Sequence, residues 1–307
     1  MMTTQPQTQL DRKQRYRGSL LGLATGDALG TTLEFQPRGS FEPITDMVGG
    51  GPFHLRPGQW TDDTSMALCL GHSLLEKRGF DADDQMQRYC AWRTHGYMSS
   101  NGRCFDIGMT VSGALSRYQR KGDPFAGSTN PSAAGNGSIM RLAPVAMFFS
   151  PDLTQVRHFA ALSSRTTHGA EECVDACALF GEMLHLALCG ASKEAILQPT
   201  FVPGAERLSA IQQGAYLGKS SHQLKGSGYV VESLEAALWC FATTDSYANA
   251  VLTAVNLGDD ADTTAAVCGQ LAGAFYGEVA IPDAWLGKLS HRSQITELAD
   301  GLLQNNA

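Results

Sequence analysis

Small and apolar residues recur along the chain at the spacing of helix faces and seldom alternate with polar ones. Residues 229–243 show the 3.6-residue period of an α-helix at five apolar positions: Val230, Val231, Leu234, Leu238 and Phe241. Stretches rich in small residues predict further helices over 18–30, 64–77, 82–94, 110–120, 156–164, 170–189, 246–256 and 262–276. Because alternating runs of β-branched residues are nearly absent, the pattern predicts an all-α fold.

Glycine and proline mark three loops between these helices. Residues 41–59 contain four such residues in succession, and residues 121–137 end on Gly135-Asn136-Gly137. Residues 198–204 contain two prolines and are expected to form a surface connection. The first two loops lead directly into polar motifs, and loops held on a rigid scaffold commonly carry binding residues.

Two acidic clusters, each edged by threonine, precede apolar helices far apart in the chain. They read Trp60-Thr61-Asp62-Asp63-Thr64 and Gly258-Asp259-Asp260-Ala261-Asp262-Thr263-Thr264. Helix capping explains one acid in each cluster but not the whole set. Neither cluster contains Lys or Arg, and carboxylates and hydroxyls suit hard divalent cations such as Mg²⁺ or Mn²⁺. If the fold brings them together, the two clusters form a two-metal site.

Local geometry within the second cluster refines this hypothesis. The spacing of Asp260 and Asp262 allows both carboxylates to face one ion across a tight turn. Gly258 permits an unusual backbone angle there, and Asp259 is free to point to solvent.

Three further segments carry polar residues whose roles the sequence leaves open. Gly135-Asn136-Gly137-Ser138 resembles a phosphate-binding loop or an ordinary turn, and Arg141 nearby could pair with a phosphate. His168 in a polar turn is either a functional residue or a satisfied structural one. Asp106 is a helix cap or a buried acid whose raised pKa suits proton transfer.

Composition narrows the class of protein. The chain has 307 residues, 43% of them apolar and 17% charged, which is typical of a packed globular protein. A formal net charge of −7 argues against a nucleic-acid partner on electrostatic grounds. No apolar run approaches the ~18 residues of a membrane span. The polar residues 1–16 predict a disordered lead-in to a domain over 17–307, and a cytoplasmic location is expected.

The eight cysteines include no CxxC pair and predict buried, reduced thiols. Cys173 and Cys177 lie one helical turn apart, with His168 upstream. A fourth ligand is missing, so this group does not predict zinc.

Taken together and in this order, six segments resemble the ADP-ribosylglycohydrolase family. They are residues 18–30, 60–66, 135–144, 167–169, 226–230 and 258–263. The resemblance implies a compact, single-domain orthogonal helical bundle around a binuclear Mg²⁺ or Mn²⁺ centre. By motif match, the implied metal ligands are Thr61, Asp62, Asp63, Asp260, Asp262 and Thr263.

The resemblance also implies roles for other residues. Glu34 matches a mobile glutamate that gates the site in some relatives, and Asp106 matches an acid near the scissile bond. Either Asp62 or Asp106 would accept the proton. The diphosphate and ribose pocket would be lined by Gly135, Asn136, Gly137, Ser138 and His168, and Tyr229 would stack on adenine.

The implied activity is metal-dependent removal of ADP-ribose from a modified protein side chain, with an arginine guanidinium as the first expectation. Alternatives are hydrolysis of O-linked or nucleic-acid-linked ADP-ribose, and a non-catalytic protein that binds ADP-ribose. The intact acids count against the last of these. A monomer is expected, and the sequence does not identify the modified protein.

Overall fold

The computed structural model describes residues 10–305, and regular structure there is helical apart from three isolated β-bridges. The long helices are α1 (Arg12–Gly30), α2 (Asp62–Lys77), α3 (Ala82–His95), α4 (Met109–Lys121), α6 (Leu153–Thr167), α7 (Glu171–Leu188), α10 (Val230–Thr243), α11 (Tyr247–Val255), α12 (Ala261–Tyr276) and α14 (Arg292–Gln304). Shorter ones are α5 (Ala143–Phe149), α8 (Lys193–Ile196), α9 (Glu206–Gln212) and α13 (Asp283–Lys288). The predicted all-α fold is confirmed.

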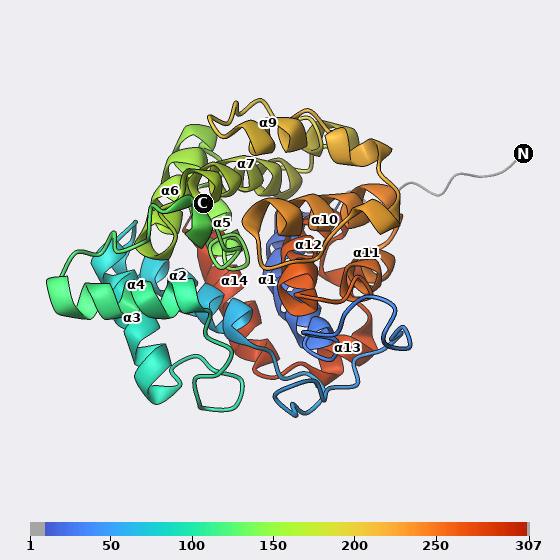
Figure 1. Cartoon of the computed structure of the whole chain (residues 1–307), viewed down its shortest axis with the longest axis horizontal. Coiled ribbons are helices and arrows are strands. Elements are labelled where there is room, and N and C mark those ends of the chain that lie inside the picture. The colour runs from blue at the N-terminus through green and yellow to red at the C-terminus, as the bar shows by residue number, and fades with distance from the viewer. Residues whose placement is uncertain (1–9, 306–307) are drawn as a thin grey trace, which may run out of the picture.

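Helices α1 and α12 lie side by side in the middle of the molecule, and the other helices surround them (Figure 1). They run antiparallel, because Gly18 of α1 meets Gly273 of α12 and Gly30 meets Asp262. Four glycines at four-residue spacing form the contact face of α1: Gly18, Gly22, Gly26 and Gly30. A Cβ atom on Gly22 would lie only 2.3 Å from the carbonyl oxygen of Gly269. The two backbones therefore touch, and this contact fixes the register of the helices.

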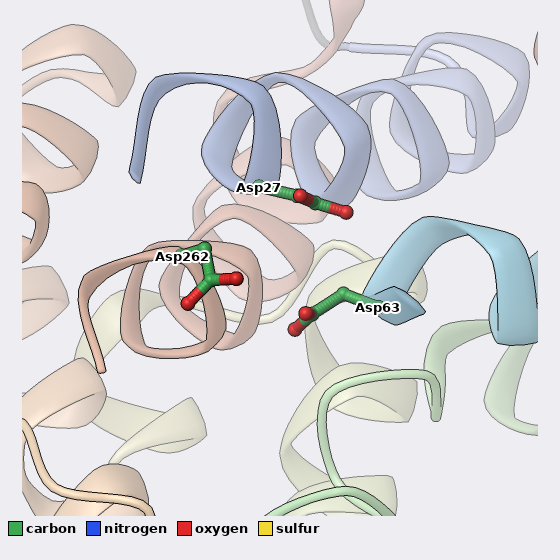
Figure 2. A group of neighbouring side chains, drawn as sticks. All are labelled: Asp27, Asp63 and Asp262. Carbon is green, nitrogen blue, oxygen red and sulfur yellow. The ribbon is translucent and has the colours of Figure 1, made fainter. Parts of the chain in front are cut away.

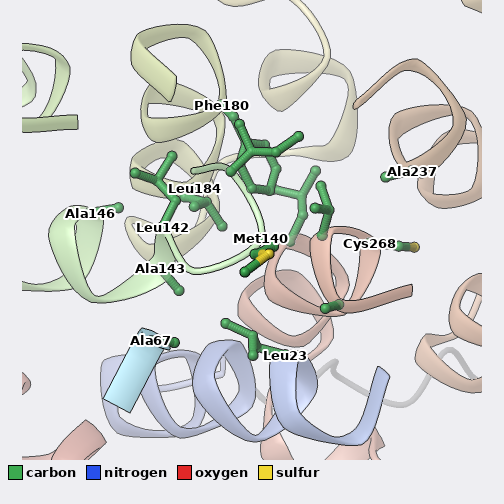
Figure 3. Packing of buried hydrophobic residues seen from close by; sticks show 14 of the residues in the cluster. Leu23, Ala67, Met140, Leu142, Ala143, Ala146, Phe180, Leu184, Ala237 and Cys268 are labelled. Atoms are coloured by element: carbon green, nitrogen blue, oxygen red, sulfur yellow. The ribbon is translucent and has the colours of Figure 1, made fainter. Parts of the chain in front are cut away.

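A continuous apolar core surrounds this helix pair. Figure 3 shows Leu23 of α1, Phe180 of α7 and Cys268 of α12 within the cluster. Residues 138–142, which join the 121–137 loop to α5, supply Met140 and Leu142 to the same cluster. The core thus holds the loop that ends on Gly137 against the central helices.

The structure differs from the predicted elements in a few places. Residues 12–16 belong to α1, and Tyr16 is fully buried with its hydroxyl donating to the carbonyl of Met147 at 3.1 Å. The predicted disordered lead-in over residues 1–16 is therefore wrong for 12–16, and residues 1–9 lie outside the described residues. Helix α14 was not predicted, although four of its residues repeat at helical spacing and are buried: Ile295, Leu298, Ala299 and Leu302.

Two expectations from composition can be compared with the structure. Cysteines 69, 173, 177, 240 and 268 are buried free thiols, but Cys189 is exposed at the end of α7, contrary to the prediction. Within residues 10–305, none of the helices has the length and apolar character that crossing a bilayer requires.

Candidate active site

A cavity of about 790 Å³ opens where the first turns of α2 and α12 meet the loops around residues 34, 106 and 136. Nine residues predicted for the site line it: Glu34, Asp62, Asp106, Gly135, Asn136, Gly137, His168, Asp260 and Thr263. The fold therefore brings the two acidic clusters together, as the two-metal hypothesis requires.

Three buried aspartates from three different helices converge beside this cavity. Figure 2 shows Asp27 of α1, Asp63 of α2 and Asp262 of α12 pointing toward one another. Each offers a carboxylate oxygen, and the three oxygens lie within 4.8 Å of one another. Oδ1 of Asp63 and Oδ1 of Asp262 are buried without a hydrogen-bond partner in the described structure. Buried acceptors with no donor need another partner, and a cation would provide one.

Asp27 was not among the predicted site residues, and it organises the start of α2. The N–H groups of Thr61 and Thr64 donate to its carboxylate at 2.8 and 3.0 Å, and both hydroxyls donate as well, at 2.9 and 2.6 Å. Thr61 precedes α2 without capping it through its own side chain, so Asp27 caps the helix from α1. Thr61 Oγ1 also lies 3.2 Å from carboxylate oxygens of Asp63 and Asp262. The available signal was an acid inside a small-residue helix, at Gly26-Asp27-Ala28.

A second carboxylate group joins Glu34 and Asp106 to Asp262, with ligand oxygens again within 4.8 Å. Burial raises the pKa of Glu34 to about 10, and the negative charge of Asp106 adds to the shift. Burial also raises the pKa of Asp106 to about 7, which agrees with the buried acid among the two alternatives that the sequence left open. A carboxyl group whose pKa lies close to neutrality can accept or release a proton at neutral pH.

Backbone pairing between loops holds these acids in place. The Phe35 N–H donates to the carbonyl of Asp259 at 2.7 Å, and the Asp259 N–H donates to Gln36 at 2.8 Å. This pairing ties the Glu34 loop to the second acidic cluster. Gly258 and Asp259 have positive φ angles of 73° and 55°, and the Asp259 side chain is exposed, as predicted.

Asp260 is linked to the glycine loop on the other side of the cavity. The amide of Asn136 donates to Asp260 Oδ2 at 2.8 Å, and the Asn136 N–H donates to the carbonyl of Gly228 at 3.0 Å. The Asp260 N–H donates to Gly226 at 2.7 Å. Residues 226–228 thereby connect the two segments that the sequence assigned to metal and to substrate.

These carboxylates form a donor set that fits divalent cations. Burial raises the pKa values of Asp62, Asp63 and Asp262 well above the ordinary range, and neighbouring carboxylates raise them further. Every salt bridge within residues 10–305 involves other acids. Among the described residues, the groups of side chains that could hold a metal consist of carboxylates and include no cysteine or histidine. Oxygen donors of this kind suit Mg²⁺ or Mn²⁺ rather than zinc.

The opposite wall of the cavity is made by Gly135, Gly137 and His168. The histidine ring packs so closely against the loop that a Cβ on Gly137 would lie 2.7 Å from its Cε1 atom. Arg141 is completely buried and donates to the carbonyl of Gly137 at 2.7 Å. Arg141 does not line the cavity, so its side chain is not placed to pair directly with a phosphate there.

Five predicted residues lie behind or beside the cavity rather than on its surface, and one of them is Asp262, which is buried. Thr61, Asp63 and Ser138 are buried and do not line it. Tyr229 pairs through its backbone with Gly135, next to the cavity, but is also absent from the lining. Its hydroxyl donates to Glu172 Oε2 at 2.7 Å, which directs the ring toward α7.

Comparison with known proteins identifies the family. The ADP-ribosylglycohydrolase family profile matches residues 8–307. The chain is 47% identical over 300 residues to the ADP-ribosylarginine hydrolase Tri1 of Pseudomonas putida (strain GB-1), covering 98% of this chain and 80% of that protein. It is 45% identical to the protein of the same name from Serratia proteamaculans (strain 568), covering 94% and 78%.

A more distant relative and a solved structure agree with this result. The ADP-ribosyl-[dinitrogen reductase] glycohydrolase of Rhodospirillum rubrum is 34% identical, covering 94% of this chain and 95% of that protein. A solved ADP-ribosylglycohydrolase-related protein complex superposes with a TM-score of 0.83 at 43% identity, covering 96% of this chain and 99% of that one. With its acidic clusters converged on one cavity, the chain belongs to the ADP-ribosylglycohydrolase family.

Proposed function

We propose that this protein is a metal-dependent hydrolase that removes ADP-ribose from arginine side chains of modified proteins. The observation that carries the proposal is the convergence of acids from α1, α2 and α12 beside one cavity, opposite a glycine loop. Acids suit cations, and a loop of small glycines lets a phosphate approach closely, so the two walls fit the two ends of an ADP-ribosyl group. Two relatives at 45–47% identity named ADP-ribosylarginine hydrolase support the choice of arginine.

The proposed metal ligands are the six predicted from the sequence: Thr61, Asp62, Asp63, Asp260, Asp262 and Thr263. Asp27 would hold Thr61 and the start of α2 in position through its four hydrogen bonds. Bound divalent ions would polarise the ribose hydroxyls and lower the pKa of a coordinated water. Either Mg²⁺ or Mn²⁺ is compatible with these oxygen donors.

Protons would be handled by the carboxyl groups at the cavity surface. In the proposed reaction, the bond between the anomeric carbon and the guanidinium nitrogen breaks while a water oxygen bonds to that carbon. Positive charge develops at the sugar in this transition state, and the surrounding carboxylates stabilise it. Asp62 or Asp106 would accept the proton of the water, and protonated Glu34 would keep a proton available for the departing guanidine.

The test compares proteins that carry ADP-ribose on arginine with proteins that carry it on serine, and with ADP-ribosylated nucleic acid. We expect release of ADP-ribose from arginine in the presence of Mg²⁺ or Mn²⁺. Release from serine or nucleic acid alone would support the O-linked or nucleic-acid alternatives. Tight binding of ADP-ribose without turnover on any substrate would support a non-catalytic binder. The cytoplasmic location and the monomeric state expected from the sequence stay predictions.

A further inference from the structure

Arg141 carries a buried positive charge that no acid neutralises within the described part of the chain. Its side chain is completely buried, and none of the salt bridges there involves it. The guanidinium lies over the ring of Tyr89, 4.9 Å from its centroid. Its other contacts are neutral oxygens of Gly137, Ser163, Thr166 and Thr167. Burying a charge among neutral groups alone lowers the stability of the fold. The presence of Arg141 at this place therefore calls for an explanation by a role in the site.

One of these contacts leads to His168. An Arg141 N–H donates to Thr167 Oγ1 at 2.7 Å, and that oxygen lies 2.9 Å from Nδ1 of His168. The neighbouring Thr166 hydroxyl donates its proton to the carbonyl of Ser163 at 2.8 Å. Thr167 has no other acceptor for its own proton among the described residues, so its hydroxyl donates to His168 Nδ1.

This direction determines which nitrogen of His168 carries the proton. Burial lowers the pKa of His168 to about 3, with the charge of Arg141 adding to the effect, so the ring is neutral at pH 7. A neutral imidazole that accepts at Nδ1 must carry its proton on Nε2. Nε2 has no hydrogen-bond partner within residues 10–305 and faces the Gly135–Gly137 loop, where the ring lines the cavity.

We propose that Arg141 and Thr167 are positioning residues that hold His168 as its Nε2–H tautomer, so that the ring donates a hydrogen bond to an anionic phosphate oxygen in the cavity. A group that only donates recognises an oxygen that only accepts, and the nearby buried guanidinium favours an anion there. The identification of the anion as a phosphate of ADP-ribose rests on the proposed function. The tautomer itself does not.

The tautomer can be read from the ¹⁵N resonances of the histidine rings in the full-length protein with Mg²⁺ bound. The His168→Asn protein assigns the His168 signals among the eight histidines. We expect a protonated Nε2 and an unprotonated Nδ1 in the wild-type protein. The isosteric Thr167→Val protein lacks the hydroxyl and should show an altered ratio of tautomers, whereas Thr167→Ser keeps the hydroxyl and should restore the wild-type spectrum.

Calorimetric titration with ADP-ribose tests the contact with the phosphate. The Thr167→Val protein should bind ADP-ribose about tenfold or more weakly than the wild type, because it loses a hydrogen bond to a charged oxygen. The Thr167→Ser protein should bind ADP-ribose with an affinity close to that of the wild type. An Nδ1–H tautomer in the wild type, or an unchanged tautomer in Thr167→Val, would overturn the positioning role. An altered tautomer with unchanged affinity would overturn the phosphate contact. A wild-type protein with the expected tautomer that hydrolyses no ADP-ribosylated arginine would refute the proposed function alone.

Discussion

Replacement of Gly22 by alanine tests whether the contact between α1 and α12 sets the geometry of the site. A Cβ atom there would lie 2.3 Å from the Gly269 oxygen and 3.2 Å from the Gly273 Cα. Both contacts are to backbone, so no side-chain rotation relieves them. An ordinary contact begins at 3.4 Å, which requires the two helices to separate locally by about 1 Å.

The expected cost follows from this displacement. Overpacking of a tight core costs about 1–3 kcal/mol, and a rigid backbone contact belongs near the upper end. Alanine is favoured over glycine in a helix by about 1 kcal/mol, so the net loss is about 2 kcal/mol. At about 2.1 cal/mol/K per residue, a protein of this length has an unfolding entropy near ~0.6 kcal/mol/K. The melting temperature should therefore fall by about 3 °C.

The same displacement should also reach the metal site. Asp27 and Asp262 lie on the two helices whose spacing changes, and ligand distances tolerate only about 0.2 Å of error. We expect the affinity for Mn²⁺ to fall by about tenfold or more. Thermal unfolding with and without Mn²⁺ measures the first effect, and calorimetric titration with Mn²⁺ measures the second.

The matched control is Gly287→Ala. Gly287 lies in α13 and is exposed, and a Cβ atom added there would have no other atom within 4 Å. This substitution should leave the Mn²⁺ affinity unchanged and raise the melting temperature slightly through helix propensity. If Gly22→Ala melts at the wild-type temperature and binds Mn²⁺ equally well, direct contact of the two backbones does not set the site.

Three further predictions concern the site. Asp62→Ala or Asp260→Ala should each lower the turnover of ADP-ribosylated arginine on the order of 10²-fold, and near-normal rates in both would remove the ligand assignment. Exhaustive chelation should abolish activity and lower the melting temperature, with Mg²⁺ or Mn²⁺ restoring both; activity that survives chelation would indicate a metal-free mechanism. The pKa of His168 falls from 6.5 to about 3 on folding, so its stabilising contribution is full above pH 6.5 and declines as the pH drops. Between pH 6.5 and 5 the free energy of unfolding of the wild type should fall by about 2 kcal/mol more than that of His168→Gln, as measured by urea unfolding. An equal fall in both proteins would contradict this prediction.

Local signals made much of the fold predictable. Small and apolar residues at helical spacing located α2, α10 and α12 to within a few residues of their observed ends. The acids at the starts of α2 and α12 were also predictable, because one helix start cannot use so many carboxylates as caps. Convergence of the two clusters depended on the tertiary fold, which the spacing of the acids alone does not determine.

The direction in which a side chain points was harder to predict from the sequence than the type of residue. Arg141 follows a glycine loop, and this position suggested a phosphate ligand. Its side chain instead points into the core and donates a hydrogen bond to the carbonyl of Gly137, on the side of the loop away from the cavity. Tyr229 lies next to Gly135, but its hydroxyl is held by Glu172 on α7. In both cases the type of residue was informative about charge or shape, while the direction of the side chain depended on distant neighbours.

Asp27 was missed, although the sequence contained the information needed to place it. Glycines recur every four residues at 18, 22, 26 and 30, and small residues recur at 265, 269 and 273 on the helix that starts at the second acidic cluster. Two ridges of small residues with the same spacing are suited to direct helix contact. Antiparallel pairing of these ridges places residue 26 against 265, and so brings Asp27 near Asp262. The glycines therefore do more than permit close packing, because their register decides which acids share the site.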